Sequence, residues 1–299
     1  MGVKSLVYRR KLLGYVFLIP MVVLLVMFMY YPIVNSVILS FTNWSGFDGD
    51  YNFIGLRNYE RLLFETPEYW KAMWVNVRFA VLSTVIQTIL GFFLAVGVIN
   101  LARRWQDFFK VALYMPVMLP AAVVSIMWRF IYTPDYGMIN QLLRAVGLSG
   151  WTRAWTADLT FALPAVIFTN TWRYVGFTMV LYYVSMLDIS KEILESAMVD
   201  GATLWQRMRY FYFPLTRGTT EINVVLSITG GLRAFDMFYL LTQGGPGGST
   251  KVVGMWIYET AFIKFRFGRA LSMSIALFVI VVVTMLISRY ILAPREDNQ

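Results

Sequence analysis

The sequence predicts an all-α integral membrane protein with six transmembrane helices. Of its 299 residues, 58% are hydrophobic and only 14% are charged, whereas charged residues make up about a quarter of an ordinary soluble domain. Six runs match the length of roughly 20 apolar residues that a helix needs to cross a bilayer. Basic residues stand beside these runs, as is typical of proteins oriented in a membrane. We therefore expect one transmembrane domain over residues 1–299.

The predicted spans are the apolar runs 12–33, 79–101, 111–132, 159–187, 221–241 and 270–288. The first follows three basic residues and is too long for a cleaved signal peptide, so we expect an uncleaved anchor. The second and the sixth contain no charged residue, and the third begins after Lys110 and ends before Pro134. The fourth is apolar except for Arg173, and the fifth contains Arg233 and Asp236.

The distribution of basic residues predicts that both termini are cytoplasmic. If six spans alternate across the membrane, the two termini and the segments 102–110 and 188–217 lie on one side. These four regions hold most of the lysines and arginines near membrane ends, which marks that side as the cytoplasm. The opposite loops are longer and richer in aromatic residues, glycine and asparagine.

The missing residue types exclude most catalytic and metal sites. The chain has no cysteine and no histidine, which removes disulfides, thiol nucleophiles, cysteine–histidine zinc sites and the most common general base. The run GGPGGSTK at 244–251 lacks the glycine–lysine–serine order of a phosphate-binding loop. The basic residues form no stripe interleaved with exposed aromatics, so nucleic-acid binding is not expected. We expect no catalytic residue and no metal site in this chain.

Arg173 has fourteen uncharged residues on each side, which places it near the middle of the bilayer. An arginine at that depth costs roughly 2.5–3.5 kcal/mol on insertion scales, so it is expected to face the interior of the bundle and to have a function. The alternative is a structural ion pair, either with Asp236 or with a partner subunit.

Two adjacent glycines, Gly230 and Gly231, interrupt the fifth span. Each weakens a helix by about 1 kcal/mol relative to alanine. Such glycines permit tight helix packing, or a local helix break of the kind that transporters use at substrate sites. Because Arg233 and Asp236 follow them, the pattern favours a site that lines an aqueous path.

The polar segment 188–217 predicts a helix–turn–helix on the cytoplasmic side. Ser190 is positioned to cap a short helix that ends at Val199, and Asp200-Gly201 then supplies a turn. Thr203 and Gln206 have the spacing of a capping box, so a second helix is expected to begin there and to run to the proline at 214. Small residues at the turn permit a second protein to approach closely. The alternative is an ordinary solvated hairpin.

This segment resembles the EAA motif of ABC importer permeases. The motif forms a helix that docks into a cytoplasmic ATPase in that family, and Ser196 departs from it by replacing the first alanine. The resemblance assigns ATPase coupling to Glu195, Ser196, Ala197, Asp200, Gly201 and Ala202, and it extends through Trp205 to the hydrophobic-x-hydrophobic-proline run at 211–214.

Four further motifs resemble the larger subunit of carbohydrate-uptake permeases: YPIVNSVILSFTNW with FIGLRNY, NTWRYVGF, and FDMFYLLTQGGPGGST. The resemblance implies the type I importer fold, a multi-pass location in a bacterial or archaeal cytoplasmic membrane, and inward transport of a sugar or glycoside by alternating access. The implied partners are a second homologous permease subunit, a cytoplasmic ATPase dimer that binds ATP and magnesium, an external solute-binding protein and membrane lipid. This chain itself is expected to hold no cofactor.

The same resemblance implies which residues meet the cargo. Aromatic faces suit the stacking of a pyranose ring, and arginines suit hydroxyl, carboxylate or phosphate groups. Polar amides of a related permease are replaced here by Gly231 and Ala234, which leaves the sugar open. A permease for another solute such as a sugar phosphate, an ion-coupled secondary transporter and a membrane enzyme are the alternatives. The expected cargo residues are Arg173, Tyr174, Phe177, Ser227, Gly230, Gly231, Arg233 and Ala234.

Overall fold

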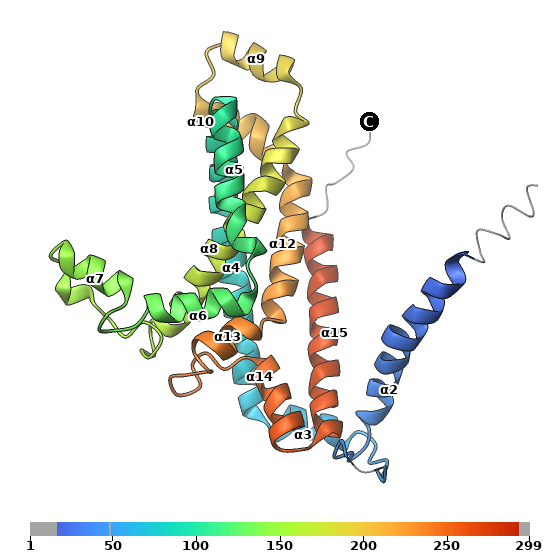
Figure 1. The fold of residues 1–299 in the computed structure, drawn as a ribbon. Coiled ribbons are helices and arrows are strands. Elements are labelled where there is room, and N and C mark those ends of the chain that lie inside the picture. Colours follow the sequence, from blue (N-terminus) through green and yellow to red (C-terminus); the bar gives the residue numbers. More distant parts are fainter. Residues whose placement is uncertain (1–16, 48, 293–299) are drawn as a thin grey trace, which may run out of the picture. The chain divides into compact units, whose positions relative to one another are not determined.

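The computed structural model describes residues 17–47 and 49–292, and the start of the first predicted span, residues 12–16, lies outside them. The described residues are helical without a β-strand, apart from an isolated bridge between Thr42 and Phe53 (Figure 1). The elements are η1 (Val26–Tyr30), α2 (Tyr31–Leu39), α3 (Arg57–Phe64), α4 (Pro67–Ile99), α5 (Arg103–Met118), α6 (Ala121–Ile131), α7 (Met138–Ala145), η2 (Ser149–Trp151), α8 (Ala162–Leu187), α9 (Lys191–Val199), α10 (Leu204–Arg207), η3 (Met208–Tyr212), α11 (Phe213–Leu215), α12 (Arg217–Leu232), α13 (Asp236–Leu241), α14 (Val253–Tyr258), η4 (Glu259–Ile263) and α15 (Phe267–Leu292). The short elements η1, η3 and η4 are π-helical turns, and η2 is a 3₁₀ turn.

Three helices of the described chain are long and apolar enough to cross a membrane: Phe17–Leu39, α4 and α15. They cover the first, second and sixth predicted runs. A fourth span is possible if α5 and α6 are counted as one bent element. The protein is therefore an all-α, multi-pass membrane protein.

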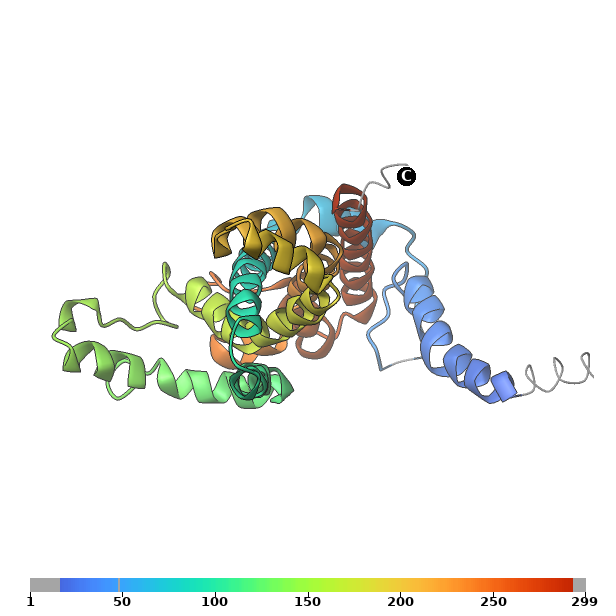
Figure 2. The ribbon, with the colours of Figure 1, turned by 90° about the horizontal axis from the view of Figure 1, so that it is seen from above.

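The third predicted span, 111–132, is wrong as a single helix. α5 and α6 divide it, and the two helices are bent by 98° relative to each other. The break lies at Leu119 and Pro120, whose backbones are both extended. Proline drives the residue before it out of the helical region, so Pro120 ends α5 at this point. Seen from above, α6 and α7 extend sideways from the bundle (Figure 2).

The fifth predicted span, 221–241, is also broken. α12 ends at Leu232, Arg233 caps it, and α13 begins at Asp236. Gly231 allows close approach to α4, because a Cβ on Gly231 would lie 2.7 Å from the Cα of Ala80. The glycine pair thus accompanies both a tight helix contact and a helix break. The fourth run, 159–187, contains one unbroken helix, α8, which begins at Ala162.

The chain divides into two compact units, residues 1–67 with 257–276 and residues 68–256 with 277–299. In the first unit, the amide of Asn58 donates to the carbonyls of Ser40 and Thr42 at 2.9 and 2.8 Å. The ring of Trp44 packs on Phe267 at 5.4 Å between centroids. These contacts join the turn after α2 to α3 and to the start of α15.

The second unit contains α4–α13 and the larger hydrophobic clusters. One cluster surrounds Phe79, Trp128 and Phe238, and another surrounds Phe92 and Tyr182. Figure 1 shows α9 and α10 at one end of this unit, beside the start of α5, with α6 and α13 farther along it. The second unit therefore carries both the predicted coupling segment, residues 188–217, and the predicted cargo residues.

The break after α12 is stabilised by Asn76, a fully buried residue of α4. Its amide nitrogen lies 3.1 Å from the carbonyl of Leu232 and 3.4 Å from that of Gly231, and its oxygen accepts from the backbone N–H of Val253 at 2.9 Å. Helix ends leave such backbone groups without partners inside the helix. One side chain therefore satisfies the end of α12 and the start of α14.

We expect Asn76→Leu, in which two methyl groups replace the amide oxygen and nitrogen, to lower the free energy of unfolding by about 2–3 kcal/mol, because it leaves buried backbone groups unpaired. Denaturant unfolding of the purified chain in detergent measures this. Asn100→Ala is the matched control: Asn100 follows the same helix and bonds only the carbonyl of Val96, at 2.7 Å. Equal stability of the two variants would contradict the role of Asn76.

Candidate functional site

A cavity of about 430 Å³ lies within the second unit, among α4, α8, α12 and the break between α12 and α13. Its volume is within the range of roughly 300–1,000 Å³ that small-molecule sites occupy. All the residues that sequence analysis assigned to the cargo line this single cavity: Arg173, Tyr174, Phe177, Ser227, Gly230, Gly231, Arg233 and Ala234.

Arg173 is half-buried and reaches the break between α5 and α6. One terminal guanidinium nitrogen donates to the carbonyl of Leu119 at 2.9 Å, and the guanidinium carbon lies 5.0 Å from the centre of the Tyr174 ring. The Nε of Arg173 is buried without a hydrogen-bond partner. Among the described residues no carboxylate, that of Asp236 included, forms an ion pair with Arg173. Asp236 lines the same cavity without that contact.

Three polar residues of the cavity were not anticipated from the sequence: Gln87, Asn170 and Thr178. Gln87 donates to the carbonyl of Asn170 at 3.4 Å and accepts from the hydroxyl of Ser227 at 3.5 Å. Thr178 donates to Asn223 at 3.0 Å. The available signal was an amide within an apolar run, since polar groups inside a membrane are costly and usually face an interior path.

The two glycines of the cavity differ in their surroundings. Gly231 is buried against α4, as described above, whereas a Cβ on Gly230 would meet no atom within 4 Å. Gly230 therefore leaves open space beside Ser227 and Arg233, and Gly231 serves packing.

The first helix of the predicted coupling segment is α9, but Ser190 does not cap it as the sequence predicted. The Ser190 hydroxyl donates to the carboxylate of Glu192 instead of accepting a backbone N–H. This hydrogen bond lowers the pKa of Glu192 below its usual range. The negative charge of Glu192, in the first turn, also interacts favourably with the positive end of the helix dipole.

The end of α9 is a Schellman turn. Gly201 has a φ of +80°, the N–H of Ala202 donates to Ala197 at 2.9 Å, and the N–H of Gly201 donates to Met198 at 3.1 Å. This pair of hydrogen bonds needs a left-handed residue after the helix cap, which favours glycine. Of the six predicted coupling residues, Ala197 is buried, Ala202 is half-buried, and Glu195, Ser196, Asp200 and Gly201 are exposed.

The predicted capping box at Thr203 is confirmed. The N–H of Gln206 donates to the Thr203 hydroxyl at 3.3 Å, and the N–H of Thr203 donates to the Gln206 side chain at 2.7 Å. The helix that follows is not a regular one, because α10 passes into the π-helical turn η3. Pro214 lies inside α11, and the junction with α12 is at Thr216.

α9 exposes several apolar residues. Val199, at the tip of the helix, is 88% exposed, and Ile193 and Met198 are exposed by 45% and 48%. Apolar side chains grouped beside a turn of small residues suit contact with another protein.

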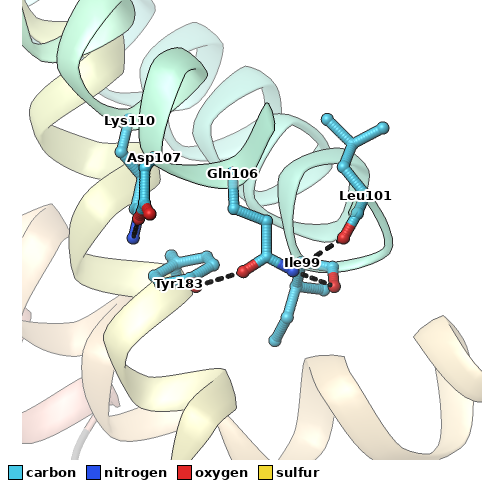
Figure 3. Close-up of polar contacts among 6 residues, drawn as sticks. All are labelled: Ile99, Leu101, Gln106, Asp107, Lys110 and Tyr183. Atoms are coloured by element: carbon cyan, nitrogen blue, oxygen red, sulfur yellow. Dashed lines mark hydrogen bonds and ion pairs between the residues drawn. The ribbon is translucent and has the colours of Figure 1, made fainter. Parts of the chain in front are cut away.

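The base of the coupling segment is tied to α5 by the end of α8. The hydroxyl of Tyr183 donates to the side-chain oxygen of Gln106, and the two atoms lie 2.9 Å apart (Figure 3). The Gln106 amide donates to the carbonyls of Ile99 and Leu101 at 3.0 and 2.8 Å. Lys110 pairs with Asp107 at 2.7 Å and lies over the Tyr183 ring. These contacts join the turn between α4 and α5 to α8.

α5 and α8 are thus held together at three levels. The bond between Tyr183 and Gln106 lies nearest to α9, and the bond from Arg173 to Leu119 lies at the cavity. Between them, a Cβ on Gly176 would lie 1.8 Å from the carbonyl oxygen of Leu113. α5 and α8 are therefore in close contact from the predicted coupling segment to the cavity.

Residues 87–296 match the family model described as "Binding-protein-dependent transport system inner membrane component". The chain belongs to this family. This family member is therefore a subunit of a transport system, and its several apolar helices make it a multi-pass membrane component.

The family member is similar to curated permeases over most of its length. It is 38% identical to the "Probable ABC transporter permease protein YurN" of Bacillus subtilis over 92% of this chain and 94% of that one. It is 27% identical to the "Trehalose/maltose transport system permease protein MalF" of Thermococcus litoralis, over 93% and 92%. It shares the fold of a chain from "a bacterial ABC transporter involved in the import of the acidic polysaccharide alginate", with a TM-score of 0.84, 22% identity and coverage of 97% and 98%.

Proposed function

We propose that this chain is the permease subunit of an ATP-driven importer for a sugar, an oligosaccharide or a glycoside. The observation that carries the proposal is the cavity, which gathers aromatic faces, amides and two arginines in the membrane-spanning unit. Several similar proteins are named as permeases for sugars, including trehalose/maltose and lactose. Aromatic stacking combined with amide and guanidinium donors is chemistry that recognises a pyranose ring and its hydroxyls.

The proposed topology has six spans with both termini in the cytoplasm of a bacterium or archaeon. The spans would be Phe17–Leu39, α4, α5 with α6, α8, α12 with α13, and α15. The positive-inside rule supports this orientation, because it places the basic residues around α9 and at the start of α5 in the cytoplasm.

The proposed assembly contains a second homologous permease subunit, an ATPase dimer that holds ATP and magnesium, and an external solute-binding protein. The alginate transporter, whose chain has a similar fold, supports the proposal of an external binding protein. Its structure was determined "in complex with alginate pentasaccharide-bound periplasmic protein". This chain would bind no cofactor and would leave ATP hydrolysis to the ATPase.

In the proposed mechanism, movement is transmitted through the second unit. The ATPase would bind α9 around Glu195–Gly201, and closure of the ATPase would move α9 together with the joined α5 and α8. Because Arg173 bonds the carbonyl of Leu119 at the cavity end of this pair, the movement would reshape the cavity and open it to alternate sides. The exposed Val199 and Ile193 would enter the ATPase contact.

We expect Arg173→Ala to raise the sugar concentration for half-maximal uptake by about 10- to 100-fold, since a hydrogen bond to a charged group contributes about 1.5–3 kcal/mol. Uptake of radiolabelled substrate by cells that express the complete importer measures this. Arg129→Ala is the control, because Arg129 is exposed on α6 and does not line the cavity. Unchanged uptake by Arg173→Ala, with normal expression, would contradict the proposal.

A sugar phosphate or sugar acid is the second candidate for the cargo. Arg173 and Arg233 both line the cavity, and Asp236 is the carboxylate among its lining residues. Competition of neutral and anionic sugars for uptake distinguishes the two candidates. If the cargo is anionic, an anionic sugar should compete better than a neutral one, and Arg173→Ala should remove that advantage. If the cargo is neutral, the anionic sugar should have no such advantage.

A further inference from the structure

A second cavity, of about 670 Å³, lies beneath the coupling segment. Its wall combines the end of α4, the start of α5, the end of α8, α9, and the segment from Arg207 to Tyr212. None of its lining residues belongs to the cargo cavity. Its size matches small-molecule sites of roughly 300–1,000 Å³. It is therefore a separate cavity, next to the part of the chain that the ATPase is proposed to bind.

The wall of this cavity is positively charged. The basic side chains are Arg103, Lys110, Lys191 and Arg207, and the acidic ones are Asp107 and Glu195. Lys110 is committed to Asp107 by an ion pair of 2.7 Å. Three cations are then left with one carboxylate, so an anion entering the cavity would be attracted.

Arg207 gives the cavity an unused donor. Its Nε is buried and has no hydrogen-bond partner. Within the described residues its guanidinium forms no ion pair, although arginine offers five N–H donors in a fork that matches phosphate. A buried donor left unpaired is costly. This cost would be removed by an acceptor in the cavity.

We propose that this cavity binds a phosphate-bearing anion. The phosphate would be held by Arg207 and Arg103, with Lys191 of α9 closing over it. Since these residues come from α10, α5 and α9, the ligand would fasten the coupling segment to the joined α5 and α8. The phosphate belongs either to the headgroup of an anionic lipid or to a small soluble molecule, because both present the same chemistry to these side chains.

The test is binding to the whole purified chain in a detergent without phosphate or sugar groups. The probes are dihexanoyl phosphatidylglycerol and inorganic phosphate, titrated by calorimetry. We expect saturable binding of one probe per chain that weakens as salt is added, because exposed charges are screened. Binding of the lipid alone identifies a headgroup site, and binding of inorganic phosphate as well identifies a site for a soluble anion.

Neighbouring arginines supply matched controls. Arg207→Gln and Arg103→Gln remove cavity residues, whereas Arg209→Gln and Arg104→Gln remove exposed arginines that do not line this cavity. We expect each cavity variant to bind at least about tenfold more weakly, since a charge-assisted hydrogen bond is lost, and both controls to bind as the unmodified chain does.

The proposal is overturned if neither probe binds, or if the controls weaken binding as much as the cavity variants. Size-exclusion profiles and melting temperatures without ligand verify folding. If Arg207→Gln does not fold, the anion-binding proposal is tested with Arg103→Gln and Lys191→Gln instead. Both residues are exposed, so their replacement does not open the core.

Discussion

Replacing Gly176 with valine is expected to reduce transport strongly. Gly176 lies where α8 touches the backbone of α5: a Cβ at this position would be 1.8 Å from the Leu113 oxygen, 2.3 Å from the Leu113 carbonyl carbon and 2.9 Å from the nitrogen of Tyr114. Backbone atoms cannot turn aside as a flexible side chain can, so the two helices must separate. That separation would also strain the bonds from Tyr183 to Gln106 and from Arg173 to Leu119.

We expect Gly176→Ala to reduce folded protein and uptake, and Gly176→Val to lower uptake at least about tenfold, because overpacking costs about 1–3 kcal/mol and rises with the added volume. Fluorescence-detected size exclusion measures the folded fraction, and uptake per folded molecule separates assembly from transport. The controls are Gly97→Ala in α4 and Gly218→Ala in α12, where an added Cβ meets no atom within 4 Å. A Gly176→Val protein that behaves like these controls would show that the close contact is unnecessary.

Replacing Gly201 with valine is expected to uncouple the permease from its ATPase. Gly201 has a φ of +80°, and it closes the turn that ends α9. A β-branched residue is a genuine outlier in this conformation, at a cost of roughly 1–2 kcal/mol. We therefore expect the end of α9 to unwind and to displace Val199, Asp200 and Ala202, which belong to the proposed docking surface.

The measurement is ATP hydrolysis stimulated by substrate and binding protein in proteoliposomes that contain the complete importer. We expect Gly201→Val to lose most of the stimulation, about tenfold or more if coupling needs an intact α9 end. Gly201→Asn is the matched control, since asparagine tolerates the left-handed region and adds a side chain. Full stimulation in Gly201→Val would refute the role of the turn, and loss in both variants would place a partner directly against this residue.

Local features of the site were predictable because their hydrogen bonds lie within a few residues. The capping box of Thr203 and Gln206 and the turn at Gly201 depend on spacings of three to five residues, which the sequence displays directly. The exception is Ser190, where a carboxylate two residues away competes for the hydroxyl. A serine beside Glu192 has two local choices, and the spacing alone does not decide between them.

Helix breaks were less predictable than apolar runs. The run 111–132 is apolar throughout its middle, so its hydropathy suggests a single span, yet Pro120 divides it. Proline is compatible with a kinked helix as well as with a break, and the neighbouring contacts choose between them. Here the freed carbonyl of Leu119 is satisfied by Arg173, which lies 54 residues farther along the chain.

Hydropathy, spacing and capping act between near neighbours, so they were enough to predict an all-α membrane protein, its apolar segments, and the positions where α9 ends and α10 begins. Three features depend instead on packing: the hydrogen bond of Arg173 to Leu119, the contact of Asn76 with the end of α12, and the meeting of the eight predicted cargo residues at one cavity. Those contacts join residues tens or hundreds of positions apart, and they exist only once α4, α5, α8 and α12 have packed against one another.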